Sequence, residues 1–209
     1  MAYTPVVALD GNNAAQSMGA LQDASGNNFP QVNLDSNRPT YRAAASFTPF
    51  ATAALTVVKL TGSASKTVRV KRILLGGTAT ALSNTLFKLI RVSAIGAGGT
   101  AVNPTVAKND TASAAATAVA THYTTAANAA DTTAEGPLSC FNLFQSTVTT
   151  PTVAFCEPQC VYPERGAPAG QSIILRTTSE ILAITCFNGG NMAAGSILQY
   201  AIEWEEDNS

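Results

Sequence analysis

The most regular alternation of hydrophobic and polar residues lies within residues 66–92. Val68 and Val70 alternate with basic residues, a pattern typical of a β-strand with one buried and one solvent-facing side. The hydrophobic positions change parity near Arg72, which indicates either a β-bulge or a strand end buried on both sides. A second alternating run follows the Gly-Gly-Thr stretch at residues 76–78, where we expect the turn between two long strands. This pair predicts the central strands of a β-sandwich.

Strand patterns continue on both sides of this pair. Residues 40–62 contain two of them, residues 138–162 contain short ones limited by prolines, and residues 171–206 contain three. One face of the last strand is predicted to lie in the core: Leu198, Tyr200, Ile202 and Trp204. Residues 94–113 are expected to be a turn-rich connection. Residues 116–124 are expected to be a strand, because threonines interrupt the alanines and no helical period is present.

The total of about nine or ten strands favours an all-β sandwich or barrel over alternating strands and helices. Residues 1–40 lack the strand pattern, and Gly, Asn, Asp and Pro interrupt their short apolar stretches. We therefore expect an extended, loop-rich N-terminal arm at residues 1–40, with a hairpin around Gly26-Asn27, and a β-sandwich domain at residues 41–209. The alternative is that the arm forms an edge strand and loop of the same domain.

The arm buries too little apolar surface to fold alone, so we expect it to gain order on a neighbouring molecule. Its apolar anchor is predicted around residues 29–34, with Phe29, Val32 and Leu34 as contact residues.

Composition restricts the partners of the chain. Charged residues make up 12% of the 209 residues, about half the usual share, and the formal net charge is −1. The chain as a whole therefore has no nucleic-acid footprint, and its weakly charged surface is typical of a protein packed against other proteins. The sequence has no apolar run long enough for a transmembrane helix and no secretory signal pattern, so we expect no membrane partner.

Charge is divided along the chain. Residues 36–109 contain ten basic residues and no acidic one, whereas residues 110–209 contain ten acidic residues and only two basic ones. This division predicts cross-strand pairs, such as Arg69 or Lys71 with Glu203 or Glu205, or a positive flank that meets the negative flank of another copy. Both can hold, and we favour the contact between copies. The predicted interface residues are Arg69, Lys71, Arg72, Glu203 and Glu205.

Candidate chemistry is sparse. His122 is the only histidine, so a catalytic triad or a histidine metal site would need it, and its neighbours carry no such pattern. We interpret it as a surface or strand histidine. The acidic end of the last strand lacks a calcium-loop pattern and is expected to be solvated: Glu203, Glu205, Glu206 and Asp207.

The four cysteines are expected to be buried free thiols: Cys140, Cys156, Cys160 and Cys186. A zinc site that uses all four and a Cys156–Cys160 disulfide are weaker alternatives. We therefore expect no enzyme activity, no metal and no cofactor.

Four motifs occur in order along the chain: TYRAAASFTP, TGSASKTVRVKRI, GGTATA and AIEWEED. This series, over residues 40–92 and 171–206, resembles a group of virion structural proteins of tailed bacteriophages and prophages. The resemblance implies a jelly-roll-like antiparallel β-sandwich and a non-enzymatic role, such as a capsid decoration (cement) protein. No functional residue is carried over, because the resemblance is to a scaffold and not to a site.

On this basis we expect a protein that is made in the host cytoplasm and located on the capsid surface of the virion. We expect a homo-oligomer, a trimer, that bridges subunits of the major capsid protein, with the arm on that protein or on a neighbouring copy. The alternative is a head–tail (neck) or tail-fibre-associated jelly-roll module that binds carbohydrate or a receptor. The few aromatic residues, mostly in core register, weigh against a carbohydrate site.

Overall fold

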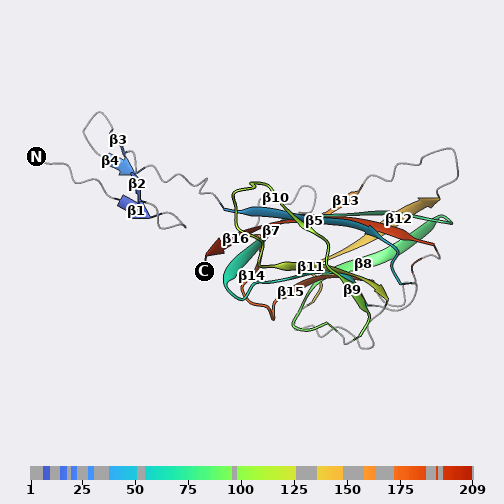
Figure 1. Cartoon of the computed structure of the whole chain (residues 1–209). Coiled ribbons are helices and arrows are strands. Elements are labelled where there is room, and N and C mark those ends of the chain that lie inside the picture. Colours follow the sequence, from blue (N-terminus) through green and yellow to red (C-terminus); the bar gives the residue numbers. More distant parts are fainter. Residues whose placement is uncertain are drawn as a thin grey trace, which may run out of the picture. The chain divides into compact units, whose positions relative to one another are not determined.

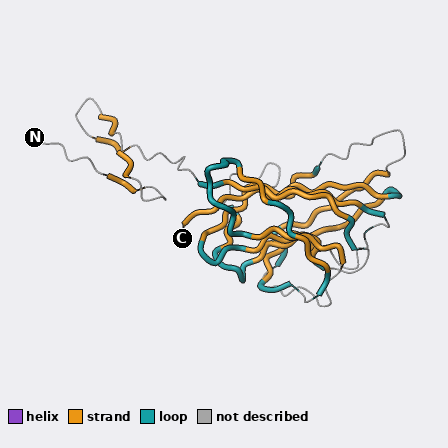
Figure 2. Tube along the Cα trace, viewed as in Figure 1, coloured by secondary structure: helices purple, strands orange, loops and turns teal. Residues whose placement is uncertain are grey.

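The computed structural model describes residues 7–9, 15–17, 20–22, 28–30, 38–50, 55–95, 98–125, 136–147, 158–162, 172–186, 192 and 195–208. The chain divides into two compact units, Met1–Arg38 and Pro39–Asp207, which are described separately. The described residues form strands and loops only (Figure 2). None of them belongs to a helix that is long and apolar enough to cross a membrane.

The N-terminal unit contains two short antiparallel strand pairs. Strand β1 (Val7–Leu9) pairs with β2 (Ala15–Ser17), and β3 (Ala20–Gln22) pairs with β4 (Asn28–Pro30). The β3–β4 pair confirms a hairpin in this stretch; the predicted turn residues Gly26 and Asn27 come between its strands in the sequence and lie outside the described residues. Phe29 lies in β4 opposite Leu21, whereas Val32 and Leu34 lie outside the described residues.

The second unit is a sandwich of two sheets, visible as two layers in Figure 1. The first sheet has the order β10 (Val106–Lys108), β5 (Thr40–Phe47), β16 (Ile197–Asn208) and β7 (Lys66–Ala79), with β13 (Gln159–Tyr162) and β14 (Ile173–Leu175) both paired to β7. The second sheet has the order β12 (Ser139–Thr147), β8 (Ser83–Val92), β15 (Ile181–Cys186), β6 (Thr56–Thr61), β11 (Val119–Thr125) and β9 (Thr100–Val102).

The strand order is that of a jelly roll. Without β9, β10 and β11, the first sheet reads β5-β16-β7-β13/β14 and the second reads β6-β15-β8-β12. The first and last strands of the fold are therefore neighbours, and successive pairs of strands wind around the barrel as two Greek keys. The sheets meet at one corner, where the ends of β7 and β12 make a short parallel contact. The predicted jelly-roll-like antiparallel sandwich is confirmed.

An insertion between β8 and β12 extends both sheets on the open side of the sandwich. Strand β10 pairs with β5, while β11 pairs with β6 and β9 pairs with β11. The strand predicted at residues 116–124 is confirmed as β11 from Val119 on, and residues 116–118 precede it. The connection predicted as turn-rich at residues 94–113 also contains two short strands, β9 and β10, which the sequence analysis missed. These strands are only three residues long, too short to show an alternating pattern.

Inward-facing side chains of both sheets form the core. The residues predicted for it from the last strand are all buried: Leu198, Tyr200, Ile202 and Trp204. In β7 the buried positions change parity at Lys71 and Arg72, which are both exposed. The partner of β7 also changes there, from β14 to β13. Two consecutive outward residues are the mark of a bulge, the first of the two predicted alternatives.

The turn predicted at Gly76–Thr78 is wrong. These residues lie within β7, and the chain reverses between β7 and β8 at residues 80–82. The glycines serve close packing instead. A Cβ atom on Gly77 would overlap the carbonyl oxygen of Ile197, and one on Gly76 would lie 3.2 Å from Cα of Pro158. A glycine inside a strand often marks such an approach of two backbones.

Candidate functional site

The single histidine is a core residue. His122 lies in β11 with 5% of its surface exposed, and its ring stacks on Phe47 at a centroid distance of 4.4 Å. Its Nδ1 lies 3.2 Å from the Tyr200 hydroxyl, and burial lowers the pKa of His122 and raises that of Tyr200. Both groups are thereby kept neutral between the sheets. The strand location predicted for His122 is confirmed, and its surface alternative is wrong.

The cysteines do not share one environment. Cys186 is buried in β15, and burial raises the pKa of its thiol to about 12. Cys160 is half-buried, with its Sγ 3.4 Å from the Tyr162 carbonyl oxygen. Cys140 is exposed, so the expectation of a buried thiol is wrong there, because its strand β12 directs Cys140 and Asn142 outward. Cys156 lies outside the described residues, and within those residues no cluster of His, Cys, Asp and Glu could hold a metal ion.

Three ion pairs join β7 to its neighbour β16. Lys71 Nζ lies 3.1 Å from Glu205 Oε1, and Arg72 Nη2 lies 3.1 Å from Glu203 Oε2. Arg69 Nε donates to Asp207 Oδ2 at 2.7 Å. The predicted interface residues Arg69, Lys71, Arg72, Glu203 and Glu205 thus lie together within one chain. This agrees with the predicted cross-strand pairing, with Asp207 as an additional partner. Their contact with another copy stays a prediction.

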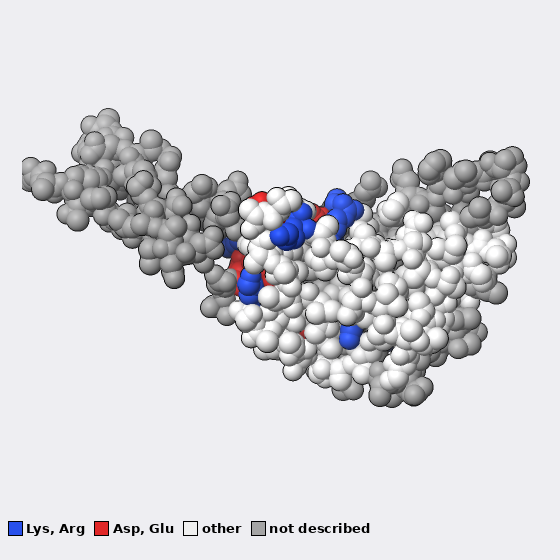
Figure 3. All heavy atoms as spheres, in the orientation of Figure 1, with Lys and Arg blue, Asp and Glu red and all other residues white. Residues whose placement is uncertain are grey.

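The surface charges are confined to part of the sandwich. On the face shown in Figure 3, charged side chains gather toward the end of β16, and most of the remaining described surface is uncharged. The side chains of Lys71 and Arg72 are 46% and 47% exposed, so solvent screens their ion pairs. Each such pair contributes roughly 0–1 kcal/mol to stability. Their contribution to the overall stability of the sandwich is therefore small.

The structure contains one buried carboxylate that the sequence analysis missed. Glu206 was expected at a solvated strand end, but it is 1% exposed. Its Oε1 accepts hydrogen bonds from Thr117 N (2.9 Å), Ala118 N (2.9 Å) and Trp204 Nε1 (3.0 Å). Its Oε2 accepts from Thr117 Oγ1 (2.7 Å) and also from Thr117 N (3.0 Å). Lys66 Nζ lies 4.0 Å from Oε2. The alternation along β16 could have predicted this burial, because residue 206 lies on the same face as the buried Leu198, Tyr200, Ile202 and Trp204.

Glu206 fastens the insertion to the sandwich. Thr117 and Ala118 directly precede β11, whereas Glu206 belongs to the last strand of the first sheet. The Tyr41 hydroxyl adds a second tie by donating to the Ala114 carbonyl oxygen at 3.0 Å. Burial and the nearby Glu206 carboxylate both raise the pKa of Tyr41. We call the group Tyr41, Thr117, Trp204 and Glu206 the carboxylate clasp; it closes one end of the sandwich.

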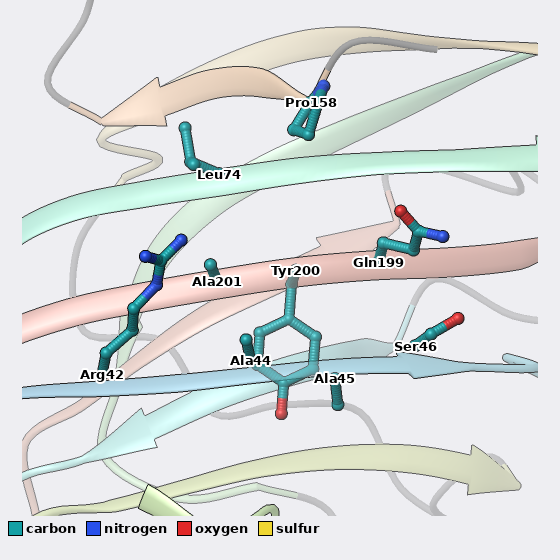
Figure 4. Close-up of a pocket in the computed structure, with 9 residues that line it drawn as sticks. All are labelled: Arg42, Ala44, Ala45, Ser46, Leu74, Pro158, Gln199, Tyr200 and Ala201. Atoms are coloured by element: carbon teal, nitrogen blue, oxygen red, sulfur yellow. The ribbon is translucent and has the colours of Figure 1, made fainter. Parts of the chain in front are cut away.

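A shallow groove of about 350 Å³ crosses the outer face of the first sheet. Its centre is formed by Ala44 of β5 and Ala201 of β16, which are directly paired. Figure 4 shows Arg42 at one end, rising from β5 toward Ala201, and Gln199 and Ser46 at the other end. The Tyr200 ring points away from the groove into the interior (Figure 4).

Several large apolar side chains are exposed in addition. They include Leu82 (79%), Phe144 (65%) and Ile197 (42%). Phe144 lies opposite Asn84 in the β12–β8 ladder, so it and Leu82 occupy the same end of the second sheet. Among the aromatic side chains whose burial is described, Phe144 is the only exposed one.

Together these features define a jelly-roll protein in which the described buried polar groups, Glu206, His122 and Tyr200, bond to other parts of the fold. The sequence matches no known protein-family model, and no similar protein was found among curated proteins or solved structures.

Proposed function

We propose that the chain is a structural protein of a phage or prophage virion, and specifically a decoration protein bound to the capsid surface. The observation that carries this proposal is the convergence of the resemblance motifs on one sheet. The motif TYRAAASFTP covers β5, TGSASKTVRVKRI and GGTATA lead into and through β7, and AIEWEED lies in β16. Strand β16 lies between the other two strands.

Side chains of these motifs also contact one another. Tyr41 and Trp204 have ring centroids 5.9 Å apart, and the ion pairs of Lys71 and Arg72 connect the second motif to the last. The motifs therefore describe one packed unit, which supports a resemblance at the level of a whole scaffold. A shared scaffold without a shared catalytic cluster favours a structural role.

The proposed mechanism is thermodynamic. A homo-oligomer, a trimer, bridges subunits of the major capsid protein and binds the assembled shell only. Binding then stabilises the assembled state by a free energy that grows with the logarithm of the free concentration of the chain over the dissociation constant. Several weak contacts per oligomer add up through avidity. Exposed apolar residues such as Leu82 and Phe144 supply contact area of the kind that buried interfaces use.

The proposal is tested on particles from a host that expresses the chain. DNA-filled heads, tails and free protein are separated by density, and the chain is quantified in each fraction by mass spectrometry. We expect it in the heads at a fixed ratio to the major capsid protein. Heads that lack it should release DNA at a lower temperature, and adding purified chain should restore them. Absence of the chain from all particles would refute the proposal.

The same fractions test the second candidate, a neck or tail-fibre module. Recovery of the chain with tails alone would favour that candidate, and glycan binding by the isolated chain would identify its ligand class. Sugar sites use exposed aromatic platforms, and the described part of the chain offers only Phe144. We therefore expect no glycan binding.

A further inference from the structure

The two ends of the groove on the first sheet differ in charge, and this difference indicates what kind of segment it can bind. Ala44 and Ala201 give it an apolar floor, and Leu74 and Pro158 add apolar area on the side of β7. Small residues surrounded by longer ones leave a depression into which apolar side chains of another segment fit. One end is cationic, because of Arg42, and the other is polar and uncharged, because of Ser46 and Gln199 (Figure 4).

Arg42 differs from the other cations of this sheet. Arg69, Lys71 and Arg72 are all paired with carboxylates of β16. Arg42 is exposed and makes no ion pair or hydrogen bond with the residues that the structure describes. Its cross-strand neighbour is Glu203, but the carboxylate of Glu203 is engaged by Arg72. The groove therefore fits an apolar segment that ends in a carboxylate.

The chain contains such a segment before β5. Residues 1–37 have no Lys or Arg and three acidic residues, Asp10, Asp23 and Asp35. Residues 31–35 read Gln-Val-Asn-Leu-Asp, so a polar residue, two alternating apolar residues and an acid follow in order. In an extended chain the side chains of Val32 and Leu34 lie on the same side. The residues 31–35 lie outside the described part of the chain, and only their sequence is used.

We propose that the groove binds residues 31–35 of a second copy of the chain. Val32 and Leu34 lie on the alanine floor. The chain turns at Asp35, the last residue of the segment, so that its carboxylate leaves the side of Asn33 and pairs with the Arg42 guanidinium. The lengths agree, because Arg42 and Ser46 are four residues apart in β5, about 13 Å at ~3.3 Å per residue, as are Gln31 and Asp35 in an extended chain. Arm and groove are different surfaces, so repetition of the contact from copy to copy forms a ring, such as a trimer, where the rotation between copies closes.

The occupant must come from another copy, because the connection within one chain is too short. Arg42 lies three residues after Pro39, about 10 Å along the strand at ~3.3 Å per residue. Only residues 36–38 separate Asp35 from Pro39, and they would have to reverse the chain as well as return this distance. A tight reversal there would leave Asp35 beside Pro39 and place Val32 near Arg42. The pairing of Asp35 with Arg42 is therefore specific to a contact between copies.

The first experiment is a charge exchange, read as self-association of the full-length chain by sedimentation equilibrium. Arg42→Asp and Asp35→Arg should each weaken self-association roughly tenfold or more, the loss of about 1.4 kcal/mol. The double variant with both changes should recover to within about threefold of the wild type, since the pair is restored with opposite sign. Matched controls are Asp23→Arg and Arg176→Asp, which make the same charge changes elsewhere and should leave association unchanged. Circular dichroism verifies that each variant is folded.

The second experiment locates the contact by disulfide crosslinking. Leu34→Cys and Ala44→Cys are placed on separate chains of different mass, in a background where the exposed Cys140 is replaced by Ser. Oxidation should join the two masses, and Asn33→Cys, which faces away from the floor, should join them less. Disulfides formed only within one chain that carries both cysteines would overturn the proposal. So would unchanged association in both single charge variants, or a wild type that stays monomeric.

A third outcome would assign the groove to the capsid. If the single charge variants kept their oligomeric state but lost binding to particles, the occupant would be the capsid protein and the proposal would be wrong. This inference adds to the proposed function the contact that joins copies. Because it is measured on the purified chain, its failure and the absence of the chain from particles are separate results.

Discussion

Replacing Glu206 tests whether the carboxylate clasp stabilises the fold as its hydrogen bonds indicate. In Glu206→Ala, the donors Thr117 N, Ala118 N and Trp204 Nε1 lose their acceptor, while Thr117 Oγ1 keeps a second acceptor, Ser63 Oγ at 2.7 Å. A buried donor without a partner costs about 1–3 kcal/mol, and water entering the vacated space recovers part of it. We expect a loss of about 3–5 kcal/mol in the free energy of unfolding, the usual range for breaking a buried charged contact.

Glu206→Gln keeps the shape and should cost much less. An amide oxygen at the Oε1 position retains the three nitrogen donors, and the amide NH2 at the Oε2 position can donate to Thr117 Oγ1. That hydroxyl then gives its proton to Ser63 Oγ, so each group keeps a partner. Only the charge-assisted part of the bonds is lost, about 1 kcal/mol.

The assay is guanidinium unfolding followed by circular dichroism, with Trp204, the single tryptophan, as a second probe. For a chain of this size about 1 kcal/mol corresponds to 2–4 °C in melting temperature, so Glu206→Ala should melt about 6–20 °C lower. The matched control is Glu205→Ala on the same strand, which removes a solvent-screened pair and should cost less than about 1 kcal/mol. If Glu206→Ala stays within about 1 kcal/mol of the wild type, or matches Glu205→Ala, the reasoning is refuted.

Three further predictions test the core. Gly77→Ala should destabilise the protein by about 1–3 kcal/mol, because its methyl group meets a backbone carbonyl, whereas Gly136→Ala, which meets no atom within 4 Å, should stay within about 0.5 kcal/mol in the same unfolding assay. Burial lowers the pKa of His122 below its usual value of 6.5, so the unfolded chain binds this proton more readily and stability should fall as pH drops below about 6.5. Comparing unfolding of His122→Phe with the wild type across this range isolates the effect, and a constant difference between them would contradict it. Thiol labelling followed by peptide mass spectrometry should show that Cys140 reacts in the native protein. Cys186, whose pKa burial raises to about 12, should react only after unfolding. Equal labelling of both thiols in the native protein would contradict the burial of Cys186.

The fold could be predicted where the hydrophobic pattern is local. Alternation in residues 66–92 identified β7 and β8, and the buried face of the last strand was read correctly to Trp204. The glycine pair at residues 76–77 failed because the same residue type marks a turn or a close approach of two backbones. The atoms that decide between these belong to Ile197 and Pro158, which are distant in sequence.

The candidate site was harder to predict because it depends on which distant segments meet. Core parity in β16 extends to Glu206, but a buried carboxylate is favourable only if donors surround it. Those donors come from residues 117–118, just before β11, and nothing in the sequence of that segment indicates that it meets the end of β16. Neither half of the clasp is recognisable alone. In contrast, His122 could be placed on a strand from the sequence. Its burial could not be predicted, because the segment around it has no clear hydrophobic pattern.

The jelly-roll strand order brings the basic and the acidic halves of the sequence side by side in the first sheet, and it explains why Arg42 in the groove has no acidic partner there. The first sheet places β16, from the acidic half of the chain, between β5 and β7, from the basic half. Three outward acids of β16, Glu203, Glu205 and Asp207, are matched one to one by three of the four bases of β7, and the fourth, Lys66, lies 4.0 Å from the buried Glu206. Arg42 on β5 is then left without an acid within the described sheet. Residues 1–37 carry three acidic residues and no basic one. The negative charge that would pair with Arg42 is therefore absent from the described sheet but present in the arm of every other copy.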